Sequence, residues 1–130
     1  MVQKEIEVIL ARHLASYLAV PMFIVDPAGT MLYYNEPAEA LLGLRYQEAG
    51  EMPLDDWSTR FQPTDEAGEP FAPGALPLAV ALSKRQTNNG RFWICTPSGV
   101  RRHLEVTAFP LIGQADRYLG AVALFWELSE

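Results

Sequence analysis

Apolar residues recur at helical spacing in the first part of the chain, residues 2–18. The main stripe consists of Val2, Ile6, Ile9, Leu10, His13, Leu14 and Tyr17. A second set lies on much of the opposite side and consists of Val8, Ala11, Ala15 and Leu18. Pro21 ends the helix, because the residue before a proline is pushed toward extended geometry. A helix with two apolar sides is expected to pack on its own domain and on a second surface, most simply another copy of itself. The alternative is an ordinary core helix.

The next segment predicts a hairpin followed by a capped helix. The run "MFIVD" (22–26) is apolar without alternation, which is typical of a strand covered on both faces. "DPAG" supplies a tight turn, and "MLYY" (31–34) forms the second strand. Asn35 is placed to cap the helix "EPAEALLG", and Gly43 to end it.

Residues 44–74 are less regular, with a short helix predicted around Trp57 and Phe61. "ALPLAVALSK" (75–84) restores a helical pattern, and "QTNNG" ends it. We expect one side of this helix to carry Leu76, Ala79, Val80 and Ser83.

Three strands are predicted at the end of the chain, at 91–97, 100–111 and 118–128. The turn "PSG" makes the first two antiparallel neighbours. In the second strand, Leu104, Val106 and Ala108 share one face, and His103, Glu105 and Thr107 share a wetter one. The last strand lacks alternation and belongs in the middle of the sheet. The result is an α+β fold with a five-stranded antiparallel sheet.

Composition narrows the class of protein. The 130 residues, 49% of them apolar and 20% charged, suit a single globular domain. A net charge of -6 opposes a nucleic-acid partner, since such affinity rests on Lys and Arg contacts to phosphates. One cysteine, Cys95, and the lack of a signal-peptide pattern favour a reducing, cytoplasmic setting. No apolar run approaches the roughly 18 residues of a membrane-spanning helix.

Four motifs in order resemble the PAS sensor domains, over about residues 20–129. They are "FIVDPAGTMLYYNEPAEALLG", "DEAGEPFAPGALPLAVAL", "TPSGVRRHLEVTAFPL" and "GAVALFWELS". The resemblance implies a five-stranded antiparallel sheet with short helices across one face and a small cavity between them. It also implies sensing or dimerisation instead of catalysis. The expected organisation is an N-terminal amphipathic dimerisation helix (1–20) and a PAS domain (21–130).

The resemblance also assigns roles to single residues. Asp26 and Gly29 match the first hairpin turn of the family, and Asn35 matches the asparagine that opens the following helix. Glu127, Leu128 and Ser129 stand where the family usually has Asp-Ile-Thr, at the exit toward a signalling helix. Glu127 is one methylene longer than aspartate, which puts the usual polar contact to the outgoing helix in doubt. The chain looks like an excised input domain or, as the alternative, a stand-alone protein.

The motifs that would identify a cofactor or an active site are missing. No reactive-cysteine motif of flavin-binding members is present, and Cys95 is expected as a buried thiol in a strand. Residues 75–84 offer no axial histidine for haem, so the cofactor stays unknown. Two distant histidines and one cysteine predict no metal site. Asp55-Asp56 and Asp65-Glu66 are interpreted as turn and cap residues, and the sequence predicts no catalytic residues and no enzyme.

The interior is the remaining candidate site, suited to a small hydrophobic or aromatic ligand if the core leaves a void. Its expected lining consists of Trp57, Phe61, Leu76, Val80, Phe92, Ile94, Leu104, Val106, Leu124 and Trp126. The function predicted is a sensory input module that binds a small molecule or a partner. It would relay the signal through a homodimer, formed by the main stripe of the N-terminal helix, to an effector absent from this chain, such as a histidine kinase or cyclase. The alternative is a ligand-free dimerisation or interaction domain with a filled core.

Overall fold

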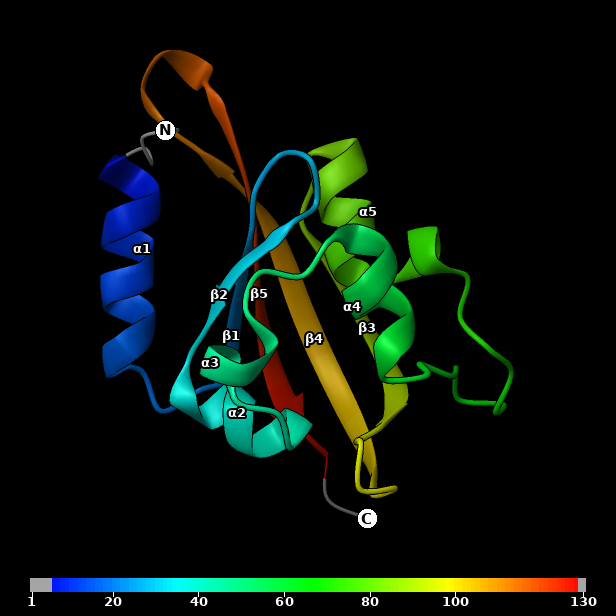
Figure 1. Ribbon diagram of the computed structural model, residues 1–130. Coiled ribbons are helices and arrows are strands. Elements are labelled where there is room, and N and C mark those ends of the chain that lie inside the picture. The colour runs from blue at the N-terminus through cyan, green and yellow to red at the C-terminus, as the bar shows by residue number, and fades with distance from the viewer. Residues whose placement is uncertain (1–5, 129–130) are drawn as a thin grey trace.

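The computed structural model describes residues 6–128, apart from the side chains of residues 15 and 73. Figure 1 shows a sheet with several helices on one face and a separate helix on the other. The helices are α1 (Ile6–Tyr17), α2 (Glu36–Leu42), α3 (Tyr46–Ala49), α4 (Leu54–Arg60), α5 (Pro77–Lys84) and the short 3-10 helices η1 (Pro73–Ala75) and η2 (Gln114–Asp116). The strands are β1 (Met22–Val25), β2 (Met31–Tyr34), β3 (Asn88–Cys95), β4 (Arg101–Ile112) and β5 (Tyr118–Glu127).

The five strands form one antiparallel sheet in the order β2-β1-β5-β4-β3. β5 lies at the centre, paired with β1 on one side and β4 on the other, as its unbroken apolar run predicts. The prediction of an α+β fold with a five-stranded antiparallel sheet and an N-terminal helix is therefore confirmed.

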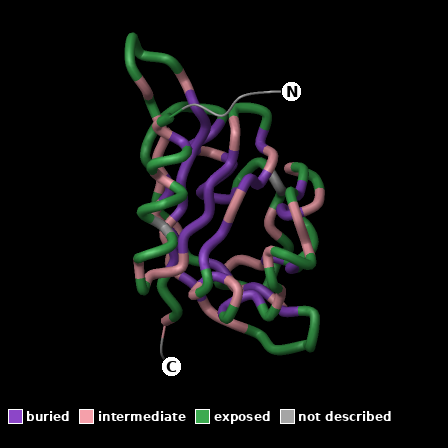
Figure 2. Tube along the Cα trace, turned by 60° about the vertical axis from the view of Figure 1, so that its left-hand side comes forward, coloured by how far each residue is buried: buried purple, intermediate pink, exposed green. Residues whose placement is uncertain are grey.

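Two apolar clusters explain why β1 is buried along its whole length. Phe23 and Val25 face an inner cluster between the sheet and helices α2, α4 and α5. Met22 and Ile24 face an outer cluster that includes Val8 of α1. Figure 2 shows the buried strands lying between these layers. A strand covered on both faces has no need of polar alternation, so "MFIV" remains apolar throughout.

The turn and the cap after β1 follow the local sequence signals. The Asp26 carboxylate accepts hydrogen bonds from the N–H groups of Ala28 (2.9 Å) and Thr30 (3.0 Å). Gly29 has a φ of 91°, which a side chain would disfavour. Asn35 caps α2 by accepting from the N–H of Ala38, and Gly43 ends the helix in the left-handed region.

Several of the expected elements differ from the structure in their bounds or in their buried side. β3 begins at Asn88 instead of 91, because the long strand β4 continues to offer pairing partners beside Asn88, Asn89 and Gly90. Of the four residues expected along one side of α5, Leu76 and Ala79 are buried, but Val80 is half-buried and Ser83 exposed. The helix also buries Leu78, Ala81 and Leu82. α5 packs on β3, β4 and β5, which all follow it in the sequence, so its buried side depends on distant residues. α1 ends at Tyr17, and Val2 lies outside the described residues.

Candidate functional site

A small cavity lies between the helices and the inner face of the sheet. Its volume is about 40 Å³. The lining side chains are all apolar: Phe23, Leu42, Trp57, Phe61, Pro63, Leu76, Pro77, Leu78, Phe92, Ile94, Leu104, Val106 and Phe125. Seven of the ten residues expected from the sequence are among them: Trp57, Phe61, Leu76, Phe92, Ile94, Leu104 and Val106.

The other three expected lining residues lie elsewhere. Val80 is half-buried on α5 and does not line the cavity. Leu124 packs against the outer cluster, and the side chain of Trp126 is 44% exposed. Alternate residues of a strand point to opposite faces, and Phe125 is the residue of this stretch that points inward. Once the pairing of β5 is known, this alternation places Phe125 in the lining of the cavity and turns Leu124 and Trp126 away from it.

The walls of the cavity are fixed by specific contacts. The indole Nε1 of Trp57 donates a hydrogen bond to the Gly29 carbonyl at 2.7 Å. The rings of Phe23 and Phe125 lie 4.5 Å apart, centre to centre, on the sheet side. Small-molecule sites usually enclose roughly 300–1,000 Å³. A void of about 40 Å³ is far smaller, so the core is nearly filled in this conformation.

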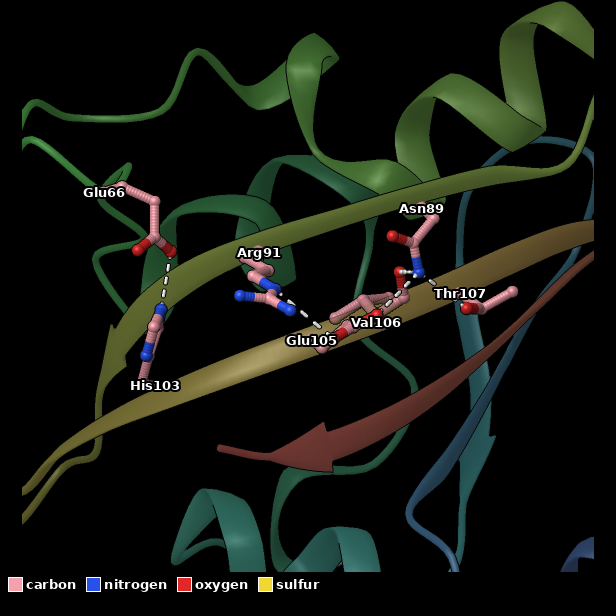
Figure 3. A network of polar contacts seen from close by, with 7 residues as sticks. All are labelled: Glu66, Asn89, Arg91, His103, Glu105, Val106 and Thr107. Atoms are coloured by element: carbon pink, nitrogen blue, oxygen red, sulfur yellow. Dashed lines mark hydrogen bonds and ion pairs between the residues drawn. The ribbon is translucent and has the colours of Figure 1, made fainter. Parts of the chain in front are cut away.

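Polar side chains gather on the opposite, outer face of β3 and β4 (Figure 3). His103 Nε2 lies 2.5 Å from an oxygen of Glu66, and Arg91 Nε lies 3.3 Å from Glu105. Asn89 donates to the Val106 carbonyl (3.1 Å) and contacts the Thr107 hydroxyl (2.9 Å). These contacts tie the edge strand and the 62–72 loop to β4. The outer face of β4 is thus the wetter one, as its alternation predicts.

The acidic residues of the turns have structural roles. Asp65 accepts hydrogen bonds from the N–H groups of Ala67 and Glu69, both at 2.9 Å, and so closes its own turn. Asp55 and Asp56 lie in the first turn of α4, where carboxylates are favourable. Within residues 6–128, no three His, Cys, Asp or Glu side chains come together as metal ligands would. Cys95 is half-buried, so it is less buried than the sequence predicts.

An ion pair joins the end of β5 to β4. Arg102 Nη1 lies 3.0 and 2.9 Å from the two carboxylate oxygens of Glu127. The longer side chain that replaces the family's aspartate therefore reaches the neighbouring strand β4. Ser129, the other residue assigned to the exit motif, lies outside the described residues.

The main stripe of α1 faces away from the sheet. The exposed fractions are 66% for Ile6, 43% for Ile9, 59% for Leu10, 57% for Leu14 and 86% for Tyr17. His13, on the same stripe, is also exposed. Val8 is buried in the outer cluster, and Ala11 and Leu18 pack against it. In this respect the helix has the two apolar sides that the sequence predicts.

Comparison with known proteins identifies the fold. The family model of the PAS domain matches residues 19–130. The structure is similar to the PAS domain of a protein from Colwellia psychrerythraea (TM-score 0.65, 16% identity, 93% of this chain and 97% of that chain). It is similar to the PAS domain of nitrogen regulation protein NR(II) from Vibrio parahaemolyticus (0.64, 19%, 92% and 98%). A LOV protein from Rhodobacter sphaeroides is also similar (0.73, 15%, 96% and 69%).

No curated protein matches the sequence significantly. Among the helices of residues 6–128, none has the length and apolar character needed to span a bilayer.

Proposed function

The chain belongs to the PAS domain family, and from that premise we propose that it is an input module of a signalling protein, relaying its signal through a dimer formed by α1. The observation that carries the proposal is the exposed apolar stripe of α1. Similar folds include PAS domains of nitrogen regulation protein NR(II) and of a two-component sensor histidine kinase. We therefore propose a histidine kinase as the effector, with a cyclase as the alternative. The reducing setting that a lone Cys95 favours agrees with a cytoplasmic module.

A second copy of this chain is the partner that best fits the stripe. Five large apolar side chains, Ile6, Ile9, Leu10, Leu14 and Tyr17, lie exposed on one side of a helix whose other side is already packed. Contiguous apolar patches usually mark an interaction surface. Two identical stripes can pack against each other about a two-fold axis, so the proposed interface needs no partner other than a second copy of this chain.

The dimer is tested by light scattering coupled to size exclusion. We expect the unmodified protein to elute as a dimer and the Leu10→Asp, Leu14→Asp double variant as a monomer, because carboxylates would be buried at the interface. Val100→Asp is the matched control, since Val100 is 47% exposed but lies far from α1 in the β3–β4 turn. A monomeric unmodified protein, or a double variant that stays dimeric, would contradict the proposal.

The interior supports a packed core more than a ligand site. A cavity of about 40 Å³ is far too small for an aromatic ligand, which could enter only if the lining side chains moved apart. We propose that the input reaches the domain through its surface or through a partner. This is the alternative that the sequence left open, a PAS interaction domain with a filled core.

Native mass spectrometry tests the interior. We expect the mass of the polypeptide alone, and no stabilisation above the baseline in a thermal-shift panel of aromatic and hydrophobic metabolites. A small molecule released on denaturation, or a saturable thermal shift that Leu104→Trp abolishes, would show that the interior is a sensor site.

A further inference from the structure

Two tyrosine rings and an arginine form a cage between α1 and the edge of the sheet. The guanidinium carbon of Arg12 lies 4.6 Å from the centre of the Tyr33 ring and 5.8 Å from that of Tyr46. The two rings are 5.4 Å apart and inclined at 70°, so they present two walls of a corner. Aromatic faces attract cations at these distances through their quadrupole. The two rings therefore already hold one cation, the guanidinium of Arg12.

Of the two walls of this cage, Tyr46 is held by hydrogen bonds, and Tyr33 packs against the outer cluster. The register of β1 and β2 shifts between Ile24 and Val25, and both Leu32 and Tyr33 consequently lie with the outer cluster. Tyr46 donates its hydroxyl to the Leu32 carbonyl, and its N–H donates to Glu39 Oε2 at 2.8 Å. Arg12, in contrast, is exposed and has a long side chain with several rotatable bonds. Arg12 is thus the most exposed member of the cage, and the two tyrosines are its more buried members.

The cage opens into a surface pocket of about 440 Å³, within the range of small-molecule sites. Glu36 and Glu39 line this pocket together with Arg12, Tyr33 and Tyr46. A second pocket, of about 430 Å³, lies against α1 and is also lined by Arg12 and Tyr33. When the arginine swings out, the first pocket keeps two carboxylates and its aromatic walls, with no cation among its lining residues. That combination suits a positively charged ligand.

We propose that the cage of Tyr33 and Tyr46 binds a small organic cation of the quaternary-ammonium type, and that Arg12 is its built-in competitor. The ligand displaces the guanidinium and so removes one of the contacts that hold α1 beside β2. Val8, in the outer cluster, and a hydrogen bond from the Gln114 N–H to Glu7 at 3.2 Å remain. This inference goes beyond the proposed function, because the site lies outside the core and does not depend on a dimer.

Choline is the probe, and its uncharged isostere 3,3-dimethylbutan-1-ol is the control ligand. Chemical shifts of the backbone amides are followed by NMR during titration of the unmodified protein. We expect saturable shifts at Tyr33, Tyr46 and along α1 with choline and none with the alcohol. Arg12→Ala removes the competitor and should tighten choline binding about threefold. Tyr33→Leu removes an aromatic face and should abolish it.

A second cation–π pair supplies the matched variant. Arg85 lies 4.3 Å from the centre of the Tyr118 ring, away from the cage, so Arg85→Ala should leave choline affinity unchanged. Equal shifts with choline and the neutral alcohol would overturn the proposal, and so would an Arg12→Ala protein that binds choline no more tightly than the unmodified chain. The ligand comparison uses unmodified protein, so it remains decisive even if Tyr33→Leu folds poorly.

Discussion

Asn35 joins three segments of the chain through one buried amide. Its Oδ1 accepts hydrogen bonds from the N–H groups of Met22 (3.0 Å) and Ala38 (3.2 Å). Its Nδ2 donates to the carbonyl of Val20 at 2.9 Å. The residue is 1% exposed, so water does not replace these partners. The same side chain therefore caps α2, positions the start of β1 and fixes the linker that leads in from α1.

Replacing this residue tests how much the three-way contact stabilises the fold. Asn35→Ala leaves two N–H groups and one carbonyl without partners in a buried place, and we expect the free energy of unfolding to fall by about 3 kcal/mol. Urea denaturation measures the change. Asn35→Ser is the matched variant: its hydroxyl can still cap α2 by accepting from the Ala38 N–H, so it should cost less than alanine. A loss below about 1 kcal/mol for the alanine variant would contradict this account.

At the scale of elements, β5 passes unusually close to the end of β1. Gly120 has a φ of 130°, and a Cβ atom there would lie 1.9 Å from the carbonyl oxygen of Val25. A contact this short with backbone cannot be relieved by turning a side chain. The glycine thus allows the central strand to pair with β1 directly after the η2 turn.

Gly120→Ala is expected to lower the free energy of unfolding by at least about 3 kcal/mol, because it adds both backbone strain and a steric clash. Gly68→Ala is the control: Gly68 also has a positive φ, 87°, but nothing lies within 4 Å of the added Cβ. Its cost should be about 1 kcal/mol, from strain alone. Thermal and urea melts of the two variants make the comparison, and equal losses would show that the close approach is unimportant.

The elements that the sequence predicts well are those with local signals. The turn at Asp26, the cap at Asn35 and the end of α2 at Gly43 each depend on residues a few positions apart. The start of β3 at Asn88 and the outward position of Trp126 depend on pairing with strands far along the chain. The cage pairs Arg12 with Tyr33, and that contact requires both the docking of α1 and a register shift. Neither the docking of α1 nor the register shift can be predicted from a local pattern of residues.

Over the whole molecule, three tyrosine hydroxyls connect separate parts of the fold. Tyr34 donates to the carbonyl of Leu44 at 2.9 Å, Tyr118 to that of Leu82 at 2.5 Å, and Tyr46 to that of Leu32. Burial is the main cause that raises the pKa of Tyr34 to about 12, and it also raises the pKa values of Tyr46 and Tyr118. The folded state therefore favours the protonated phenols, which are the forms that donate.

The sign of the resulting pH dependence follows from these shifts. A phenol whose pKa rises from 10.0 to about 12 on folding contributes fully below pH 10 and loses that contribution as the pH rises toward 12. We expect the free energy of unfolding to fall across this window in urea melts. Tyr34→Phe should cost about 1 kcal/mol near neutral pH, through the lost hydrogen bond, and should make the alkaline decline shallower. Identical slopes for Tyr34→Phe and the unmodified chain would show that this buried phenol does not couple protonation to folding.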